Sequence, residues 1–182
     1  MRPAPHLLML VPAAMAAAPT AHAVSYLAIP QAQAAVFPSA ERFVDAKAHL
    51  TDDQRDAIKK LSGVRQREPE QPVWRVEQGG KQVGWFFIDE VVGKHEFITY
   101  ALGTTLDGHV TGIEILDYRE TYGFQVREAS WRQNFQGKSL ADPLQLDSDV
   151  PNITGATLSC RNVTNGVKRL LALQRIALTD AK

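Results

Sequence analysis

The sequence predicts an α+β fold, in which a twisted, mainly antiparallel sheet is packed by a C-terminal helix and preceded by an N-terminal helical hairpin. Residues 72–118 alternate between apolar and polar positions and are interrupted by short turns, which is typical of strands. From about Leu158 onward the apolar residues recur at helical spacing. Two helix-start patterns lie between residues 39 and 54, ahead of the strands.

The composition is that of one ordinary globular domain. The chain has 182 residues, 45% hydrophobic and 22% charged, and is therefore long enough to bury a core. Lys and Arg (20) balance Asp and Glu (20), so no strong field for nucleic acid is expected. Cys160 is the only cysteine, which excludes an internal disulfide and a multi-cysteine zinc, iron–sulfur or haem-attachment site.

The first segment has the pattern of a secretory signal peptide. Arg2 precedes an apolar stretch at 7–18, and residues 21–23, Ala-His-Ala, form a small-x-small cleavage pattern. The apolar stretch is short for a helix that spans a bilayer. We predict cleavage before Val24 and export to the periplasm. An uncleaved N-terminal anchor, which would leave the protein associated with the membrane, is the alternative.

The next segment is predicted to be a helical hairpin. Ser39 is placed to cap a helix over residues 40–50. Thr51 and Gln54 form a T-x-x-Q capping box for a second helix, which ends near Gly63. We expect this hairpin to act as a lid or platform rather than as a catalytic unit.

The middle of the chain predicts a meander of about four strands. Gly79 and Gly80 join the first two strands as a hairpin turn, and residues 104–108 form a later turn. In the strand that leads into the later turn, alternate residues should face opposite sides of the sheet. The two sets are Phe97, Thr99 and Ala101 on one face and Ile98, Tyr100 and Leu102 on the other.

Helices and a loop follow the sheet. Trp131 and Phe135 are four residues apart and predict a short helix packed on the sheet. Residues 136–151 form a loop or an edge segment. The closing helix should pack an apolar stripe against the sheet, formed by Val163, Val167, Leu170 and Leu171.

Residues 154–159, Thr-Gly-Ala-Thr-Leu-Ser, place small residues where the closing helix begins. Gly155 permits a backbone conformation that other residues resist. Ala156 is small enough for a bulky group to lie close to the backbone. Thr157 or Ser159 is suited to cap the helix.

The same helix start is suited to hold a phosphate. The first turn of a helix leaves free N–H groups and a partial positive charge. Arg161 and Lys168, further along the helix, can add positive charge. The alternative is a capped helix that binds no ligand.

The motif resembles the [ST]-G-A-[ST]-x-[ST] flavinylation motif of exported FMN-binding domains. Such domains occur in subunits of the sodium-pumping NADH:quinone oxidoreductase and of the Rnf complex. In that family a flavin transferase joins the FMN phosphate to the second hydroxyl residue of the motif by a phosphodiester bond. The resemblance therefore implies covalent FMN on Thr157 and a flavin transferase as a maturation partner. The neighbouring cofactor-binding residues that it implies are Thr154, Gly155, Ala156, Leu158 and Ser159.

Residues 119–140 resemble a second segment of the family, an E-T-P-G turn followed by a tryptophan and an F-x-G-K-S-like stretch. The matching residues are Glu120, Thr121, Gly123, Trp131, Phe135, Gly137 and Lys138. The family's turn lies against the flavin, so the resemblance adds Glu120, Thr121, Tyr122 and Gly123 to the implied cofactor-binding residues and places them near Thr157. Tyr122 departs from the usual proline. Pro151 also stands where the family often has an aspartate, and this departure concerns recognition by the transferase.

The resemblance covers roughly residues 70–175. It divides the chain into a signal peptide at 1–23, a helical segment at 24–66 and an FMN-binding domain at 67–182. It implies a periplasmic electron carrier, or a subunit of an oxidoreductase, that passes electrons between a membrane or periplasmic redox partner and another acceptor. No catalytic residue, metal or nucleic acid is expected. The alternative is a flavin-free accessory or structural module of a membrane complex.

Four further side chains leave alternatives open. Cys160 lies in the first turn of the predicted helix and is either buried filler or a thiol of lowered pKa near the flavin. His95 is either a solvated turn residue or a ligand to the flavin ring or a haem. Tyr118 and Tyr122 flank the predicted turn and either stack on the flavin or pack on the sheet.

Overall fold

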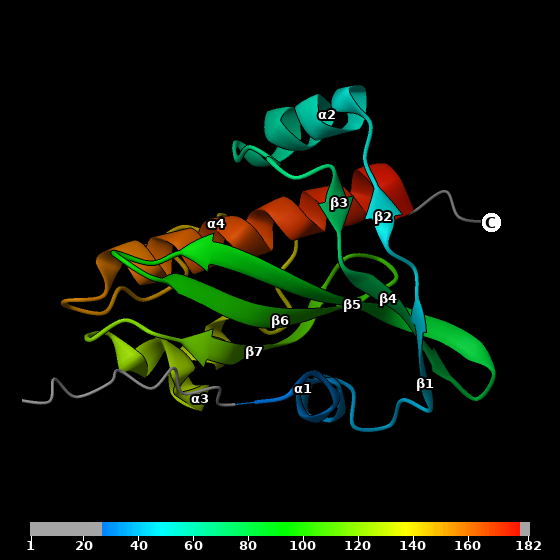
Figure 1. Ribbon diagram of the computed structural model, residues 1–182, viewed down its shortest axis with the longest axis horizontal. Coiled ribbons are helices and arrows are strands. Elements are labelled where there is room, and N and C mark those ends of the chain that lie inside the picture. The colour runs from blue at the N-terminus through cyan, green and yellow to red at the C-terminus, as the bar shows by residue number, and fades with distance from the viewer. Residues whose placement is uncertain (1–26, 179–182) are drawn as a thin grey trace, which may run out of the picture.

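A five-stranded antiparallel sheet separates two helical layers (Figure 1). The computed structural model describes residues 27–178. The predicted signal peptide at 1–23 and its cleavage point lie outside the described residues. The strand order is β1-β4-β5-β6-β7, and a two-stranded sheet pairs β2 with β3. The predicted α+β class, with a mainly antiparallel sheet and a C-terminal helix, is confirmed.

The helices and strands follow in this order. The large sheet contains β1 (Arg42–Asp45), β4 (Val73–Gln78), β5 (Lys81–Val92), β6 (Phe97–Thr105) and β7 (Val110–Tyr118). The small sheet contains β2 (Ala48–His49) and β3 (Glu70–Gln71). The helices are α1 (Ile29–Val36), α2 (Asp52–Ser62), α3 (Ala129–Arg132) and α4 (Thr157–Leu173), with 3₁₀ turns at Phe124–Arg127 and Gln133–Phe135 and a π turn at Gln174–Leu178.

Strands β4 to β7 form the predicted meander. Gly79 and Gly80 both have positive φ, 57° and 70°, and make the β4–β5 turn. The faces of β6 are also as predicted. Ile98, Tyr100 and Leu102 belong to the larger core on the α4 side, whereas Ala101 belongs to the smaller core on the α1 side.

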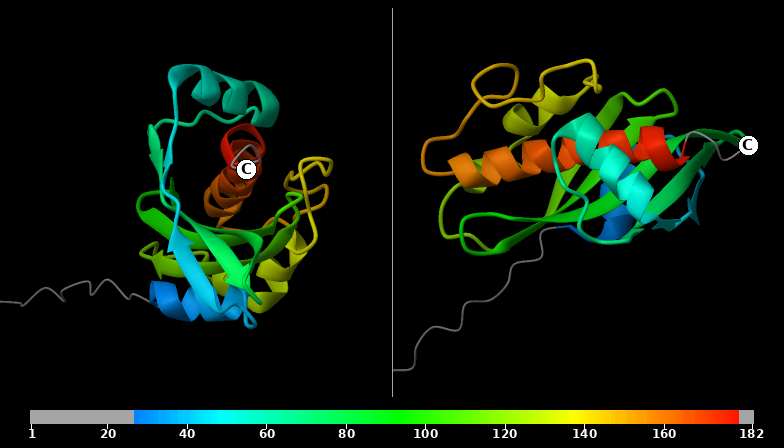
Figure 2. Two further views of the ribbon diagram at one scale, coloured as in Figure 1. Left: turned by 90° about the vertical axis from the view of Figure 1, so that its right-hand side faces the viewer. Right: turned by 90° about the horizontal axis from the view of Figure 1, so that it is seen from above.

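Helix α4 covers one face of the sheet along most of its length (Figure 2). Its predicted stripe is buried: Val163, Val167 and Leu170 have no exposed surface, and Leu171 is 2% exposed. Trp131 and Phe135 are also buried, and their rings meet edge to face with centroids 5.1 Å apart. The short helix that these two residues predicted is therefore confirmed.

Helix α1 packs on the opposite face, over a row of glycines. Gly103 on β6 pairs with Gly112 on β7. A Cβ at Gly103 would lie 2.2 Å from Val36 Cγ1 and 2.7 Å from the ring of Phe37. Only glycine leaves room for the end of α1 to approach the sheet this closely.

The predicted N-terminal hairpin is only half right. Helix α2 is present with the predicted capping box: the amide of Gln54 donates to the Thr51 hydroxyl at 3.2 Å, and Gly63 ends the helix at φ 74°. The helix predicted over residues 40–50 is wrong, because β1 and β2 lie there. Phe43 pairs with Val76 on β4 and packs its ring 5.6 Å from Phe86, so pairing with a distant strand decides this segment.

The two N-terminal helices do not pack against each other as a hairpin. Figure 2 shows four layers in the order α2, α4, sheet and α1. Helix α2 contacts α4, whereas α1 contacts β6 and β7. The N-terminal residues therefore contribute to both sides of the sheet.

A buried polar network ties the layers together. The Arg169 guanidinium on α4 donates to Asp89 Oδ2 on β5 at 2.5 Å and also to the side-chain oxygen of Gln66. The Tyr100 hydroxyl donates to the same Asp89 oxygen at 2.6 Å. Burial and the Asp89 carboxylate raise the pKa of Tyr100 well above its usual value, so this hydroxyl stays protonated as a donor.

Candidate functional site

Helix α4 begins at Thr157 without a side-chain cap. The N-cap residue is Ala156, whose methyl group accepts no hydrogen bond, so the predicted cap by Thr157 or Ser159 is wrong. A tight turn precedes the helix, in which the Ala156 amide donates to the Ile153 carbonyl at 2.9 Å and Gly155 has φ 85°. The N–H groups of the first helical turn are therefore not used by an N-cap side chain.

The three hydroxyl residues of the motif differ in accessibility. Thr154 is exposed, Thr157 is half-buried, and Ser159 is only 2% exposed. Within the described residues the Thr157 hydroxyl makes no hydrogen bond, so it is not held by the protein. A reagent from solvent could reach Thr154 and Thr157 but not Ser159.

The two predicted motifs meet in the fold. Gly123 has φ 85°, and a Cβ placed on it would lie 2.4 Å from Ala156 Cβ. Only glycine allows this turn to pack on the residue that precedes Thr157. The Tyr118 hydroxyl fixes the same turn by donating to the carbonyl oxygen of Tyr122. The predicted proximity of segment 120–123 to the helix start is confirmed at Gly123.

Glu120 points to a neighbouring loop. Its Oε1 accepts from three consecutive backbone N–H groups in the β5–β6 turn, those of Lys94, His95 at 2.6 Å and Glu96 at 3.0 Å. Partial burial raises the pKa of Glu120, but the three N–H donors outweigh this and hold its pKa below the usual value. Glu120 therefore acts on the site by fixing the β5–β6 turn beside it.

We expect Glu120→Gln to destabilise the protein by about 1 kcal/mol, because the amide oxygen is a weaker acceptor than the carboxylate. The stabilisation by the charged form is present above the unfolded pKa of about 4.3 and is lost as pH falls through the lower folded-state pKa. Urea unfolding between pH 3 and pH 7 measures this. Equal acid sensitivity of wild type and variant would contradict it, and Glu68→Gln, an exposed glutamate, is the control.

Other residues of the second motif fix the segment that leads to Thr157. The Trp131 indole N–H donates to the Pro151 carbonyl at 2.8 Å. The Lys138 ammonium pairs with Asp149 at 2.9 Å, and Asp149 accepts from the amides of Leu144 and Gln145. Asp149 is thus a structural turn residue, and these motif positions hold backbone in place.

Exposed apolar side chains gather on the segments around this helix start. Strands β5 and β6 contribute Val92 and Phe97, which pair across the hairpin. The Asn162 amide, one turn beyond exposed Leu158, donates to the Val92 carbonyl at 2.6 Å and joins α4 to that hairpin. Tyr122 and Phe124 extend from the turn packed on Ala156 and are 76% and 57% exposed.

The exposed fractions of Tyr118, Tyr122 and Cys160 bear on the alternatives left open for these side chains. Tyr118 is 3% exposed and packs in the core, whereas Tyr122 does not pack on the sheet. Cys160 is fully buried, and burial raises the pKa of its thiol, which favours the buried-filler alternative over a thiol of lowered pKa. The backbone N–H of His95 is held by Glu120.

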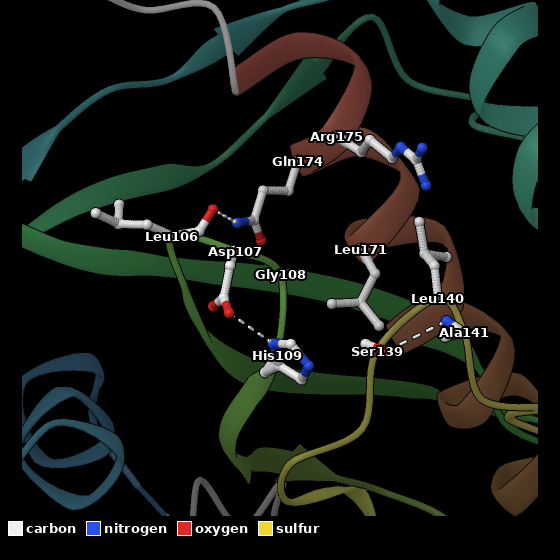
Figure 3. A pocket seen from close by; sticks show the side chains of 10 residues that line it. All are labelled: Leu106, Asp107, Gly108, His109, Ser139, Leu140, Ala141, Leu171, Gln174 and Arg175. Atoms are coloured by element: carbon white, nitrogen blue, oxygen red, sulfur yellow. Dashed lines mark hydrogen bonds and ion pairs between the residues drawn. The ribbon is translucent and has the colours of Figure 1, made fainter.

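Among the cavities formed by the described residues, two border α4 and are not lined by Thr157. The larger, of about 450 Å³, lies at the far end of the helix between the β6–β7 turn and residues 139–141 (Figure 3). There the Gln174 amide holds the β6–β7 turn and Asp107 pairs with His109 at 3.1 Å. The smaller, of about 330 Å³, lies one helical turn beyond Thr157, against residues 143–147.

The described residues were also compared with the patterns of a metal site and of a membrane-spanning helix. Across residues 27–178, no three or more His, Cys, Asp or Glu side chains are grouped as a metal site. None of the helices described there combines the length and the apolar character needed to cross a membrane.

Comparison with known proteins shows a family match over part of the chain. Residues 93–172 match the FMN-binding domain family. The chain is 27% identical over 128 residues to the G subunit of the Na(+)-translocating ferredoxin:NAD(+) oxidoreductase complex of Acetobacterium woodii, covering 62% of this chain and 60% of that protein. It is 32% identical over 83 residues to the G subunit of an ion-translocating oxidoreductase complex of Erwinia tasmaniensis, covering 40% of each. The chain thus spans less than two thirds of either relative.

Two solved structures share the fold. NqrC from Shewanella oneidensis superposes with a TM-score of 0.54 at 16% identity, covering 78% of this chain and 86% of that one. The C subunit of the Na(+)-translocating NADH-quinone reductase from Parabacteroides distasonis gives a TM-score of 0.51 at 13% identity, covering 77% and 80%. Segment 120–123, residue Thr157 and the helix start all lie inside the residues matched to the family.

Proposed function

We propose that the protein carries electrons on FMN joined covalently to Thr157, because residues 93–172 match the FMN-binding domain family. The observation that carries the proposal is the packing of Gly123 on Ala156, which brings the second motif against the helix that bears Thr157. We also propose that the FMN-binding unit extends over residues 67–182, because β4 and β5 continue the same sheet as β6 and β7.

The residues at the helix start fit FMN. Thr157 offers a half-buried hydroxyl without a partner in the described residues, which is suited to form a phosphodiester bond. The first turn of α4 offers backbone N–H groups to the phosphate oxygens. Apolar side chains at the same end, among them Tyr122 and Leu158, offer a surface for a flat aromatic ring. Of the motif hydroxyls, Ser159 is too buried to serve as the attachment point.

Bound FMN would supply the electron-carrying chemistry, and the chain would supply its surroundings. Thr157 would keep the cofactor from being lost by dissociation. Thr154, Gly155, Ala156, Leu158 and Ser159 would form the backbone around the attachment point, and Thr121, Tyr122 and Gly123 the turn beside it. Glu120 would act through the β5–β6 turn that its carboxylate holds.

We further propose a periplasmic location and a redox partner in a membrane complex. The signal-like pattern of residues 1–23 supports export. The similar proteins named as subunits of ion-translocating oxidoreductase complexes support a membrane-bound partner. Attachment of FMN would require a flavin transferase during maturation.

The proposal is tested by producing the full chain with and without a coexpressed flavin transferase. With the transferase, we expect yellow periplasmic protein whose mass is increased by one FMN less one water, and whose colour survives denaturation and gel filtration. Protein that stays colourless with an active transferase would overturn the covalent assignment. That result would favour the flavin-free accessory or structural module. The same mass measurement gives the length of the mature protein and so tests cleavage before Val24.

A further inference from the structure

Tyr122 carries a bare aromatic ring on the segment that packs against the start of α4. Its side chain is 76% exposed, more than any other large apolar side chain in the described residues. Its hydroxyl makes no hydrogen bond within residues 27–178. The family that this segment resembles usually has proline at the same position, so the ring is a feature of this chain. An exposed aromatic ring is a surface on which another flat ring can stack.

The backbone that carries this ring is fixed beside the helix start. The Tyr122 carbonyl accepts a hydrogen bond from the hydroxyl of Tyr118, whose own ring is buried in the core. The next residue, Gly123, has φ 85° and packs on Ala156 so closely that a Cβ would lie 2.4 Å from Ala156 Cβ. The fold therefore sets where Tyr122 stands relative to the helix start.

Tyr122 lies within reach of a flavin attached to Thr157. A Cβ on Gly123 would lie 3.3 Å from Ala156 Cα. Consecutive Cα atoms are about 3.8 Å apart, so those of Tyr122 and Thr157, one residue further on either side, are at most about 12 Å apart. The ribityl chain between the phosphate of FMN and its ring spans a gap of this size. The turn before the helix also leaves room, because a Cβ at Gly155 would meet no atom within 4 Å.

Phe97 is a second exposed aromatic residue, but its ring lies on the other face of the sheet. It is 55% exposed and begins β6. Side chains alternate along a strand, so Phe97 shares its face with Ala101, which belongs to the core on the α1 side. Helix α4 and Thr157 lie on the opposite face. Phe97 is therefore a matched control for the ring of Tyr122.

We propose that the isoalloxazine ring of FMN on Thr157 stacks on the ring of Tyr122. The inference rests on the proposed function, because it takes the covalent FMN as given. Offset stacking of two flat rings is favourable, and the face of a tyrosine ring is negative. Stacking therefore stabilises the electron-poor oxidised flavin more than the electron-rich reduced flavin. Tyr122 holds the ring in place and lowers the midpoint potential of the flavin.

The test uses the full chain made with a coexpressed flavin transferase, and intact mass establishes which variants carry FMN. A stacked tyrosine quenches flavin fluorescence, because its phenol gives an electron to the excited ring. Tyr122→Leu should therefore raise the fluorescence several-fold, whereas Tyr122→Trp, which keeps an electron-donating ring, should leave it low. Tyr122→Leu should also favour the reduced flavin about two- to tenfold, which raises the midpoint potential of a two-electron couple by about 10–30 mV. Phe97→Leu should change neither quantity.

Two further measurements keep the test decisive if Tyr122→Leu takes up no flavin. Tyr122→Phe keeps a ring that stacks but donates electrons poorly, so its fluorescence should rise while its potential stays near that of the wild type. Urea unfolding of the wild type separates the two rings while the covalent flavin stays attached, so the fluorescence should rise several-fold as the protein unfolds.

The opposite results separate the stacking from the attachment. Flavin-bearing Tyr122→Leu or Tyr122→Phe protein that is no brighter than the wild type would overturn the stacking and leave the covalent attachment standing. An equal change in Phe97→Leu, or a wild type that is no brighter when unfolded, would do the same. A wild type whose mass shows no FMN, made with an active transferase, would overturn the proposed attachment and the stacking with it.

Discussion

Replacing Thr157 by alanine is expected to give a folded protein that carries no covalent flavin. The substitution removes the hydroxyl that would receive the phosphate and leaves the backbone of α4 unchanged. Within the described residues that hydroxyl has no hydrogen-bond partner, and alanine favours helix more than threonine does. Stability should therefore change by less than about 1 kcal/mol. Intact mass, visible absorbance after denaturation and far-UV circular dichroism measure the two effects separately.

Neighbouring hydroxyls provide the controls. Thr154→Ala removes an exposed hydroxyl before the helix and should retain covalent flavin. Thr157→Ser keeps a hydroxyl at the same position and should retain covalent flavin if the transferase accepts serine. Ser159→Ala tests the buried hydroxyl and should also retain flavin, because Ser159 is only 2% exposed. Covalent flavin on the Thr157→Ala protein would move the attachment to another residue without removing the flavin from the protein.

The parts of the fold that were predicted correctly have local causes. The β4–β5 hairpin follows from Gly79 and Gly80, whose positive φ values the turn requires. Helix α2 follows from a capping box and a terminal glycine that lie within its own length. Residues 40–50 became strands because Phe43 pairs with Val76 and packs on Phe86, and neither partner lies near it in the sequence. No local pattern in the segment indicates that pairing.

The candidate site also has parts that could be predicted from the sequence and parts that could not. The resemblance brought segment 120–123 and Thr157 together, and the contact of Gly123 with Ala156 gives the physical reason for glycine at that position. The partner of Glu120 could not be predicted, because the amides that it accepts from belong to a turn more than twenty residues earlier. The missing cap had a visible signal, since Ala156 precedes Thr157 and has no polar side-chain atom.

The smaller cavity could not be predicted from the sequence, although two of the charged residues that line it were noted there. Arg161 and Lys168 were recognised as charges that follow the helix start, but their spacing alone does not give a cavity. The cavity depends on residues 143–147, whose shape Asp149 sets through two backbone amides and Lys138. Positive φ at Leu144 and Asp147 is a product of those tertiary contacts. The sequence alone therefore could not predict this cavity.

Replacing Arg169 by methionine is expected to destabilise the protein by about 3 kcal/mol. Methionine retains most of the apolar stem but removes the guanidinium that donates to Asp89 and Gln66. The Asp89 side chain is 8% exposed, so its charge would stay buried, with the Tyr100 hydroxyl as its remaining side-chain donor among the described residues. The site is also tightly packed, since a Cβ at Gly166 would lie 2.2 Å from the Tyr100 hydroxyl oxygen. Urea unfolding at neutral pH measures the loss.

A surface arginine provides the matched control. Arg75 pairs with Glu77 at 3.1 Å, but its side chain is 44% exposed, so Arg75→Met should cost only about 0.2–1 kcal/mol. The double variant Arg169→Met with Asp89→Leu removes both charges and should be more stable than Arg169→Met alone, because no carboxylate is then left without its cation. Equal losses for Arg169→Met and Arg75→Met would show that the buried pair adds no more than a surface pair. Flavin attachment at Thr157 should persist in any variant that stays folded, because the network lies on the other half of α4 from the helix start.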